Sequence, residues 1–251
     1  MGAGAVVGAG AVMASGCGAD PGPVDSGAPS DARIAFDAGA ASDASLRDAA
    51  REDAGSTTMW RVAVLPDTQY YARDEPALFE SHAAWVRDER DRLRTQFVLH
   101  LGDIVDDNSV AQWSVAERAL DQFDGVLPLA LAVGNHDLGT GGSADARDTR
   151  LNDHFDFDEF AASHGLVESH VPGRLENALY RMGTPTGNWL VLSLEFGPRP
   201  DVLAWAARAL EAHPVVPTIL ITHAYLYEDD TRYDARTRPD QFYSPYSYGL
   251  A

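Results

Sequence analysis

The chain of 251 residues contains no lysine and a single cysteine, and its 38 acidic residues outnumber its 19 arginines. The resulting net charge of −19 repels polyanions and anionic bilayers, so nucleic acid is not expected as a ligand. With Cys17 as the only cysteine, no disulfide can form within the chain. The missing lysine by itself carries no functional weight.

The sequence also lacks a long apolar run at its N-terminus. Residues 3–14 are small and apolar, but a bilayer takes about 20 residues to cross. Such a run fits the core of an export signal, and the block Ala14-Ser15-Gly16-Cys17 after it resembles a bacterial lipobox. Cys17 would then be lipidated and become the mature N-terminus. Two features depart from that pattern: no basic residue precedes the run, and Ala14 replaces the usual leucine. The alternative is a lone cysteine in an uncleaved leader.

Residues 18–58 are almost free of aliphatic and aromatic side chains and are rich in Ala, Asp, Ser and Pro. A segment of this composition cannot bury enough apolar surface to fold, so we predict a disordered acidic linker. It would give a tethered domain reach from a membrane. We therefore expect an export signal over residues 1–17, the linker, and a folded domain over 59–251. The expected location is outside the cytoplasm, as a cell-envelope lipoprotein or a periplasmic or extracellular protein, with Cys17 as the only membrane attachment.

The folded part reads as an α/β domain. Apolar runs at residues 60–65, 97–101 and 127–133 predict buried strands, and amphipathic helical patterns begin at Pro76 and cover 111–123. This β-α-β-α-β order implies parallel strands with right-handed crossovers. Further elements are predicted as strands over 178–182, 189–196 and 217–222 and helices over 154–164 and 200–212, with no regular structure after residue 225.

Metal-binding side chains follow four of these strands. They are Asp67, Asp103 after Gly102, the block Gly134-Asn135-His136-Asp137, and His223. Strands of an α/β sheet deliver such residues to one crevice at their carboxyl ends. Any one of these residues alone could be a helix cap, a turn or a satisfied strand-end histidine. All of them together, each at a strand end, favour a metal site.

Two carboxylates, the Asn135 carbonyl oxygen and the His223 imidazole suit Zn, Mn or Fe better than Ca. One carboxylate can bridge two ions while the other binds one of them. His136 lies beside the metal ligand Asn135, where it can act on a substrate. Asp137 could hold that imidazole in one orientation and favour its protonated form.

These blocks resemble the successive motifs of the calcineurin-like metallophosphoesterases, over residues 60–227. The matching motifs are Asp67-x-Gln69, Gly102-Asp103-Ile104-Val105-Asp106, Gly134-Asn135-His136-Asp137 and Thr222-His223. The resemblance implies a four-layer α/β sandwich with a two-metal centre. It implies that Asp67 binds the first metal, Asp103 bridges, and Asn135 and His223 bind the second. Phosphate esters would be hydrolysed by a hydroxide that the two metals activate, and His136 would stabilise the transition state and protonate the leaving oxygen.

Two departures from the family pattern bear on activity. Gln69 stands where the family has a histidine, and a Gln carbonyl is a weaker ligand, so the first metal should be held loosely unless Asp106 or another side chain assists. The family also closes with a Gly-His-x-His block, whereas no histidine follows His223 here. Either the sequence is a fragment that lacks the last strands of the sandwich, or the protein is a degenerate relative. The intact Asp103, Asn135, His136 and His223 favour the fragment. This exact chain is therefore expected to bind metal weakly and to be poorly active.

Two functions from different classes remain open at this point: a metal-dependent phosphoesterase, and a non-catalytic surface domain that uses the same fold for binding. The sequence does not indicate the substrate, the metal or the oligomeric state. Tyr70, Tyr71 and the tyrosine-rich stretch from residue 225 to 248 could line a substrate pocket, although such residues more commonly cover the rim of the core.

Overall fold

The computed structural model describes residues 59–250. The predicted export signal, the lipobox-like Cys17 and the linker lie outside these residues. Within the described part, no helix is both long and apolar enough to cross a bilayer.

The first sheet is parallel and has the order β1 (Arg61–Leu65), β2 (Thr95–His100), β3 (Leu129–Leu131). Leu65 lies opposite His100, which in turn lies opposite Leu131. Parallel neighbours need crossover connections, which are supplied here by α3 (Pro76–Asp88) and α5 (Val110–Leu120). The predicted β-α-β-α-β order is confirmed, and it brings the carboxyl ends of all three strands to one edge.

The second sheet has the order β4 (Leu166–Ser169), β5 (Ala178–Thr184), β6 (Gly187–Ser193), β7 (Thr218–Ile221). Its first three strands are antiparallel, and β5 and β6 form the predicted hairpin. β7 is parallel to β6, and α8 (Pro200–Glu211) makes the crossover between them. The direction of β7 therefore carries the chain toward the same edge as the first sheet.

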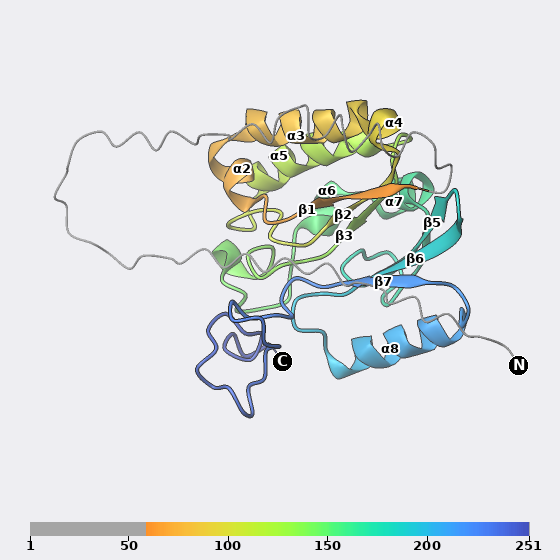
Figure 1. Cartoon of the computed structure of the whole chain (residues 1–251). Helices are drawn as coiled ribbons and strands as arrows, with labels where there is room; N and C mark the ends of the chain where they lie inside the picture. The colour runs from red at the N-terminus through yellow and green to blue at the C-terminus, as the bar shows by residue number, and fades with distance from the viewer. Residues whose placement is uncertain (1–58, 251) are drawn as a thin grey trace, which may run out of the picture.

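Figure 1 shows four layers: α3 and α5, the first sheet, the second sheet, and α8. The side chains of β6 alternate between its two faces, and this explains how the second sheet contacts both α8 and the first sheet. Leu190 and Leu192 pack with Trp205 of α8, whereas Val191 joins the larger core between the sheets together with Tyr180. Because successive side chains of a strand point to opposite faces, one strand serves both layers. The expected four-layer α/β sandwich is confirmed.

Two of the departures from the predicted elements lie between residues 151 and 169. The helix expected over residues 154–164 is broken into α6 (Leu151–His154) and α7 (Phe157–His164). Asp156 starts α7 as its N-cap, since its carboxylate accepts hydrogen bonds from the backbone N–H groups of Asp158 and Glu159, both at 3.0 Å. β4 was not predicted, because its four residues are largely exposed and carry little apolar pattern.

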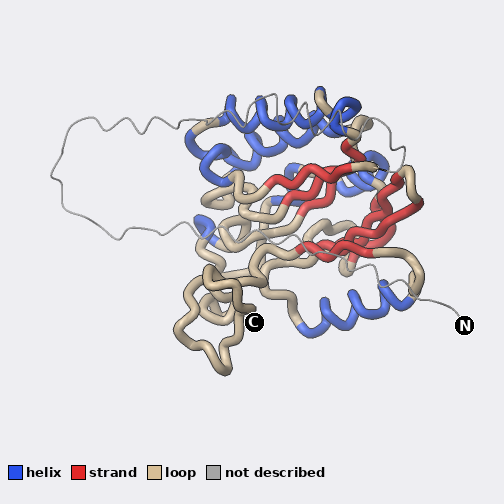
Figure 2. Tube along the Cα trace, viewed as in Figure 1, coloured by secondary structure: helices blue, strands red, loops and turns tan. Residues whose placement is uncertain are grey.

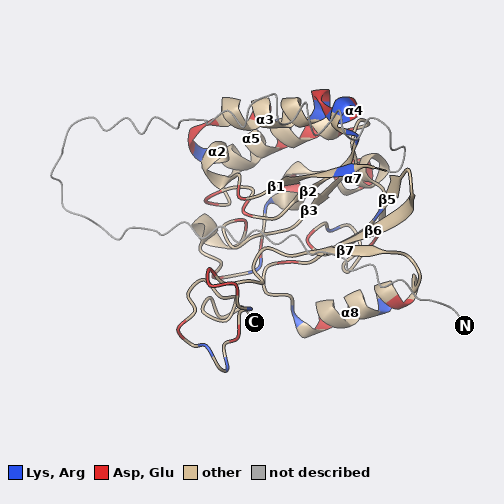
Figure 3. Ribbon diagram, in the orientation of Figure 1, with Lys and Arg blue, Asp and Glu red and all other residues tan. Residues whose placement is uncertain are grey.

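The other short elements are α2 (Gln69–Asp74), α4 (Arg90–Leu93) and the 3-10 turns at Asp121–Phe123 and Thr140–Gly142. After β7 the chain runs to residue 250 without a further helix or strand, as expected, apart from an isolated bridge between Leu226 and Arg232 (Figure 2). Figure 3 shows arginines and acidic residues close together along the ribbon in α4 and near both ends of α8. The surface ion pairs at α4, Arg90 with Asp91 and Arg92 with Glu89, add little to stability.

Candidate metal centre

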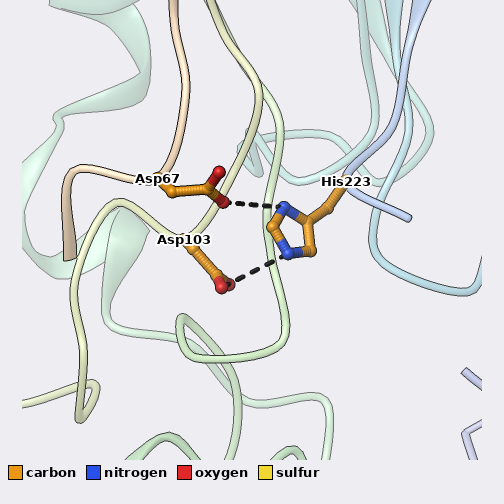
Figure 4. A group of neighbouring side chains, drawn as sticks. All are labelled: Asp67, Asp103 and His223. Atoms are coloured by element: carbon orange, nitrogen blue, oxygen red, sulfur yellow. Dashed lines mark ion pairs between the residues drawn. The ribbon is translucent and has the colours of Figure 1, made fainter. Parts of the chain in front are cut away.

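Three of the five predicted metal ligands meet at the common edge of the two sheets. Asp67 follows β1, Asp103 follows β2 and His223 follows β7. Each offers a ligand atom, and these atoms all lie within 4.8 Å of one another. In Figure 4 both carboxylates point toward the two nitrogens of the imidazole.

The imidazole of His223 is held in a ligand-like orientation. Its Nδ1 lies 3.0 Å from the backbone carbonyl oxygen of Leu101, so this nitrogen carries a proton and donates it. Its Nε2 lies 3.3 Å from Oδ2 of Asp103. Two tetrahedral ligands of one cation, each at about 2.1 Å, are about 3.4 Å apart. The Nε2 and Oδ2 atoms are thus spaced as two ligands of a single ion, and a carbonyl on the other ring nitrogen is the usual second partner of a metal-binding histidine.

The charges of this cluster are unbalanced. Burial acts to raise the pKa of Asp103, but the charge and hydrogen bond of His223 outweigh it and hold the pKa below its ordinary value. Burial acts to lower the pKa of His223, and the carboxylates of Asp103 and Asp67 instead raise it to about 9. Burial, with the charge of Asp103 adding to it, raises the pKa of Asp67 to about 6. Two carboxylates, that of Asp103 buried and that of Asp67 half-buried, thus share one imidazolium, which is a site that favours an added cation.

Two glycines allow the strand ends to approach this closely. A Cβ on Gly134 would lie 2.1 Å from Oδ1 of Asp103, and a Cβ on Gly102 would lie 2.9 Å from Nδ1 of His223. Gly102 also has φ +99°, in the region that favours glycine. Asp67 and Asp103 themselves have φ of 39° and 49°, left-handed conformations that are costly for residues with a side chain. Strained backbone at both carboxylates is typical of a functional site.

His136 is oriented by Asp106 rather than by its neighbour in sequence. The Nδ1 of His136 lies 2.8 Å from the backbone carbonyl oxygen of Asp106 and 3.5 Å from the Asp106 carboxylate. That carboxylate also accepts a hydrogen bond of 2.7 Å from Arg73. The backbone N–H of His136 donates to Oδ1 of Asp103 at 3.0 Å. This hydrogen bond joins the loop that carries His136 to the candidate metal centre.

The expected contact between Asp137 and the His136 imidazole was wrong. The Asp137 carboxylate is fully buried and accepts hydrogen bonds from the backbone N–H groups of Val105, at 2.9 Å, and Gly134, at 2.8 Å. Burial, reinforced by the charge of Asp103, raises the pKa of Asp137 to about 7. Asp137 therefore joins the loop after β2 to the loop after β3, and each of its carboxylate oxygens accepts a backbone N–H there rather than bonding to the ring.

Sequence reasoning gave no role to His100, the last residue of β2. It is fully buried, its Nδ1 accepts a hydrogen bond from the N–H of Gly102 at 3.3 Å, and its Nε2 lies 2.9 Å from Oγ1 of Thr68. Thr68 in turn donates to the carbonyl oxygen of Ile104 at 3.0 Å. This chain of bonds joins the turn that carries Asp67 to the loop that carries Asp103. A single polar residue inside an apolar strand was the only signal.

Gln69 and Asn135 complete the set of predicted ligands. Gln69 is buried at the start of α2, and its Oε1 has no hydrogen-bond partner among the residues that the structure describes. Asn135 is 8% exposed and its Nδ2 lies 3.5 Å from the hydroxyl of Tyr248. Carboxylate oxygens, an imidazole nitrogen and an unsatisfied buried carbonyl oxygen are donors that borderline divalent ions accept. The residues present therefore fit a metal centre.

Comparison with known proteins agrees with this geometry. A model of the calcineurin-like phosphoesterase family matches residues 61–246. The uncharacterized protein YvnB of Bacillus subtilis (strain 168) is 30% identical over 177 residues, which make up 69% of this chain but 13% of YvnB. The family match covers both sheets and every residue of the candidate metal centre, so the chain belongs to the calcineurin-like phosphoesterase family.

Proposed function

We propose that the protein is a metal-dependent hydrolase of phosphate esters. The observation that carries the proposal is the convergence of Asp67, Asp103 and His223, whose ligand atoms lie within 4.8 Å of one another beside His136. Membership of the calcineurin-like phosphoesterases supports the reaction class. YvnB is far longer than the part matched here and its own activity is not given by its name, so the likeness to it adds no substrate.

Asp103 is the residue best placed to be shared between two ions, because its two oxygens face different partners. Its Oδ2 faces His223, while its Oδ1 accepts the backbone N–H of His136. We assign Asn135 and His223 to one ion and Asp67 with Gln69 to the other, with Fe, Mn and Zn as the candidate metals. Two such ions, when bound, would lower the pKa of a water molecule and neutralise charge on a phosphate.

His136 is assigned the proton transfer. Its Nδ1 faces a backbone carbonyl oxygen, which only accepts, so this nitrogen holds its proton as a donor. The proton to be moved must therefore be carried by Nε2, and about a third of the side chain is accessible to solvent and substrate. A proton delivered from Nε2 to the leaving oxygen would favour cleavage of the ester bond.

The test is reconstitution of the full chain with Mn²⁺, Fe²⁺ or Zn²⁺, followed by metal analysis and hydrolysis of p-nitrophenyl phosphate and bis(p-nitrophenyl) phosphate. We expect metal to bind weakly, hydrolysis to be slow but dependent on the metal, and vanadate or tungstate to inhibit. Asp103→Asn should abolish metal binding and activity, and His136→Asn should abolish activity alone. Asp91→Asn, at an exposed carboxylate of α4, is the matched control.

The rival function is a non-catalytic binding domain on the same fold, which the replacement of an imidazole by Gln69 favours. It predicts metal-loaded protein that hydrolyses neither ester, and His136→Asn that behaves like the parent chain. The same measurements therefore separate the two functions.

We also propose export and lipid attachment through Cys17. The support is the apolar run of residues 3–14, the block Ala14-Ser15-Gly16-Cys17 and the acidic composition of residues 18–58. Expression in a bacterial host with a clickable palmitate analogue tests this. The parent chain should be labelled and sediment with membranes, whereas Cys17→Ala should be unlabelled. Equal labelling of the two would contradict the proposal.

A further inference from the structure

We propose that Tyr248 is a positioning residue for the candidate metal centre, acting on both predicted ligands of one ion. Its hydroxyl would orient the amide of Asn135, and its ring, through Phe196, would fix the imidazole of His223. The inference rests on the proposed function, because it assumes that Asn135 and His223 bind metal.

The contact with Asn135 concerns the direction of an amide. The Nδ2 of Asn135 lies 3.5 Å from the Tyr248 hydroxyl and donates toward it. Asparagine binds a cation through its carbonyl oxygen, and in a planar amide this oxygen lies opposite the nitrogen. With Nδ2 turned to the Tyr248 hydroxyl, Oδ1 lies on the other side of the amide and is left for a metal. Asn135 is 8% exposed, so without the hydroxyl its Nδ2 would have little access to a solvent acceptor.

The contact with His223 runs through a stack of rings. The ring of Tyr248 meets that of Phe196 edge to face, with centroids 5.5 Å apart at 80°. Phe196 is fully buried and meets the imidazole of His223 at 6.0 Å and 61°. Edge-to-face pairs restrict the rotation of both partners. Because Leu101 fixes one nitrogen of His223 and Phe196 packs on its ring, the imidazole has little freedom left.

A half-buried arginine holds the stretch of chain that carries Tyr248. The guanidinium of Arg147 donates to the carbonyl oxygens of Phe196, at 3.2 Å, and Gly197, at 2.7 Å, and also to that of Leu250. One side chain thereby joins the turn after β6 to the last described residues. Packing is close at the same point, since a Cβ on Gly197 would lie 2.5 Å from Cβ of Pro245. The stretch of residues 225–250, which forms the dark blue coil in Figure 1, has no helix or strand, and its last residues, from Pro245 to Leu250, hold it beside the metal centre.

The test is calorimetric titration of the full apo chain with Mn²⁺, together with its thermal unfolding. Tyr248→Phe removes the hydroxyl and keeps the ring, and we expect about tenfold weaker binding at one site, the effect typical of a group that orients a ligand. Tyr248→Ala also removes the ring contact and should weaken binding further. The matched control is Tyr246→Phe, at an exposed tyrosine two residues away, which should bind Mn²⁺ as the parent does. The melting temperature of the apo Tyr248→Phe chain should equal that of the parent.

Parent-like Mn²⁺ affinity in both Tyr248 variants would overturn the inference, and so would an equal loss in Tyr246→Phe. A lower melting temperature of apo Tyr248→Phe with unchanged Mn²⁺ affinity would assign the residue a purely structural role, which also overturns it. If the parent chain itself binds no Mn²⁺, the proposed function fails and this inference fails with it. If the parent binds and hydrolyses, only the role of Tyr248 is in question.

Discussion

The Nδ1 atom of His136 lies 2.8 Å from the backbone carbonyl oxygen of Asp106, while Asp137, its neighbour in sequence, bonds only to backbone N–H groups of two loops. The two aspartates flank the same catalytic candidate yet differ in their surroundings. Asp106 shares its carboxylate with Arg73 and remains partly accessible, whereas Asp137 is fully buried. Their substitution should therefore affect different properties.

Asp106→Asn should lower kcat about 10- to 100-fold, toward the lower end of what a positioned proton donor contributes. The carbonyl contact to the ring survives, but the negative charge beside it is lost.

Asp137→Asn should lower the free energy of unfolding by about 1–3 kcal/mol, because an amide cannot accept both backbone N–H groups. Steady-state hydrolysis at saturating metal and urea unfolding of each variant measure the two effects. Unfolding that is equally easy in both variants, with equal kcat, would argue against this division of roles.

Gly134→Ala should weaken metal binding at the candidate metal centre. The added Cβ would lie 2.1 Å from Oδ1 and 2.2 Å from the backbone nitrogen of Asp103, so the carboxylate must move. We expect Mn²⁺ affinity to fall at least about tenfold, since a displaced ligand costs no less than a lost orienting group. Gly183→Ala is the control, because nothing lies within 4 Å of its added Cβ. Equal Mn²⁺ binding by the two variants would show that the close approach of the loops is not needed.

The parallel first sheet made much of this site predictable. Once the order of strands and helices was read, Asp67 and Asp103 had to reach one edge of this sheet, because each follows a parallel strand that ends there. His223 follows β7 of the second sheet, which meets the first at the same edge. The direction of single side chains was not predictable in the same way. Asp137 was expected to hold His136 because the two are adjacent, but its carboxylate accepts backbone N–H groups of two loops, and the partner of His136 is Asp106 in the loop after β2.

Long-range contacts were also beyond a pattern-based prediction. The role of His100 depends on Thr68, which is 32 residues away, and the docking of the last described stretch depends on Arg147, which is 103 residues from Leu250. No periodicity marks such pairs. The stretch of residues 225–250 looked like a polar tail because it has no regular pattern, and its contribution to the site is visible only in the contacts of Tyr248.

Gln69→His should strengthen metal binding. The Gln69 side chain is buried, and within residues 59–250 its Oε1 has no hydrogen-bond partner. An imidazole is a better ligand than an amide oxygen for Zn or Mn. We expect Gln69→His to bind the more weakly held ion about tenfold more tightly, and Gln69→Ala to bind it about tenfold less tightly. Changes of this size are usual when a residue next to a bound metal is replaced. Calorimetric titration with Zn²⁺ and Mn²⁺ measures both. Identical affinities in the two variants would mean that position 69 does not reach the metal.

The stability of the protein should fall in mild acid partly because of His100. Complete burial lowers the pKa of His100 from 6.5 to about 3, the nearby charge of His223 adding to the effect. Between pH 6.5 and 3 the unfolded chain therefore binds a proton at this residue that the folded chain does not. The free energy of unfolding falls as pH drops through this window, by up to about 1.4 kcal/mol per pH unit from this group, and the effect vanishes above pH 6.5.

The variant His100→Gln tests this, because it keeps a donor toward Thr68 but cannot be protonated. Its unfolding free energy, measured in urea at pH 6.5, 5.5 and 4.5, should fall less steeply than that of the parent, with the two curves diverging by about 2 kcal/mol over this range. Parallel curves would show that the folded protein accommodates a charged His100, in which case the hydrogen-bonded neutral imidazole is not what joins the turn of Asp67 to the loop of Asp103.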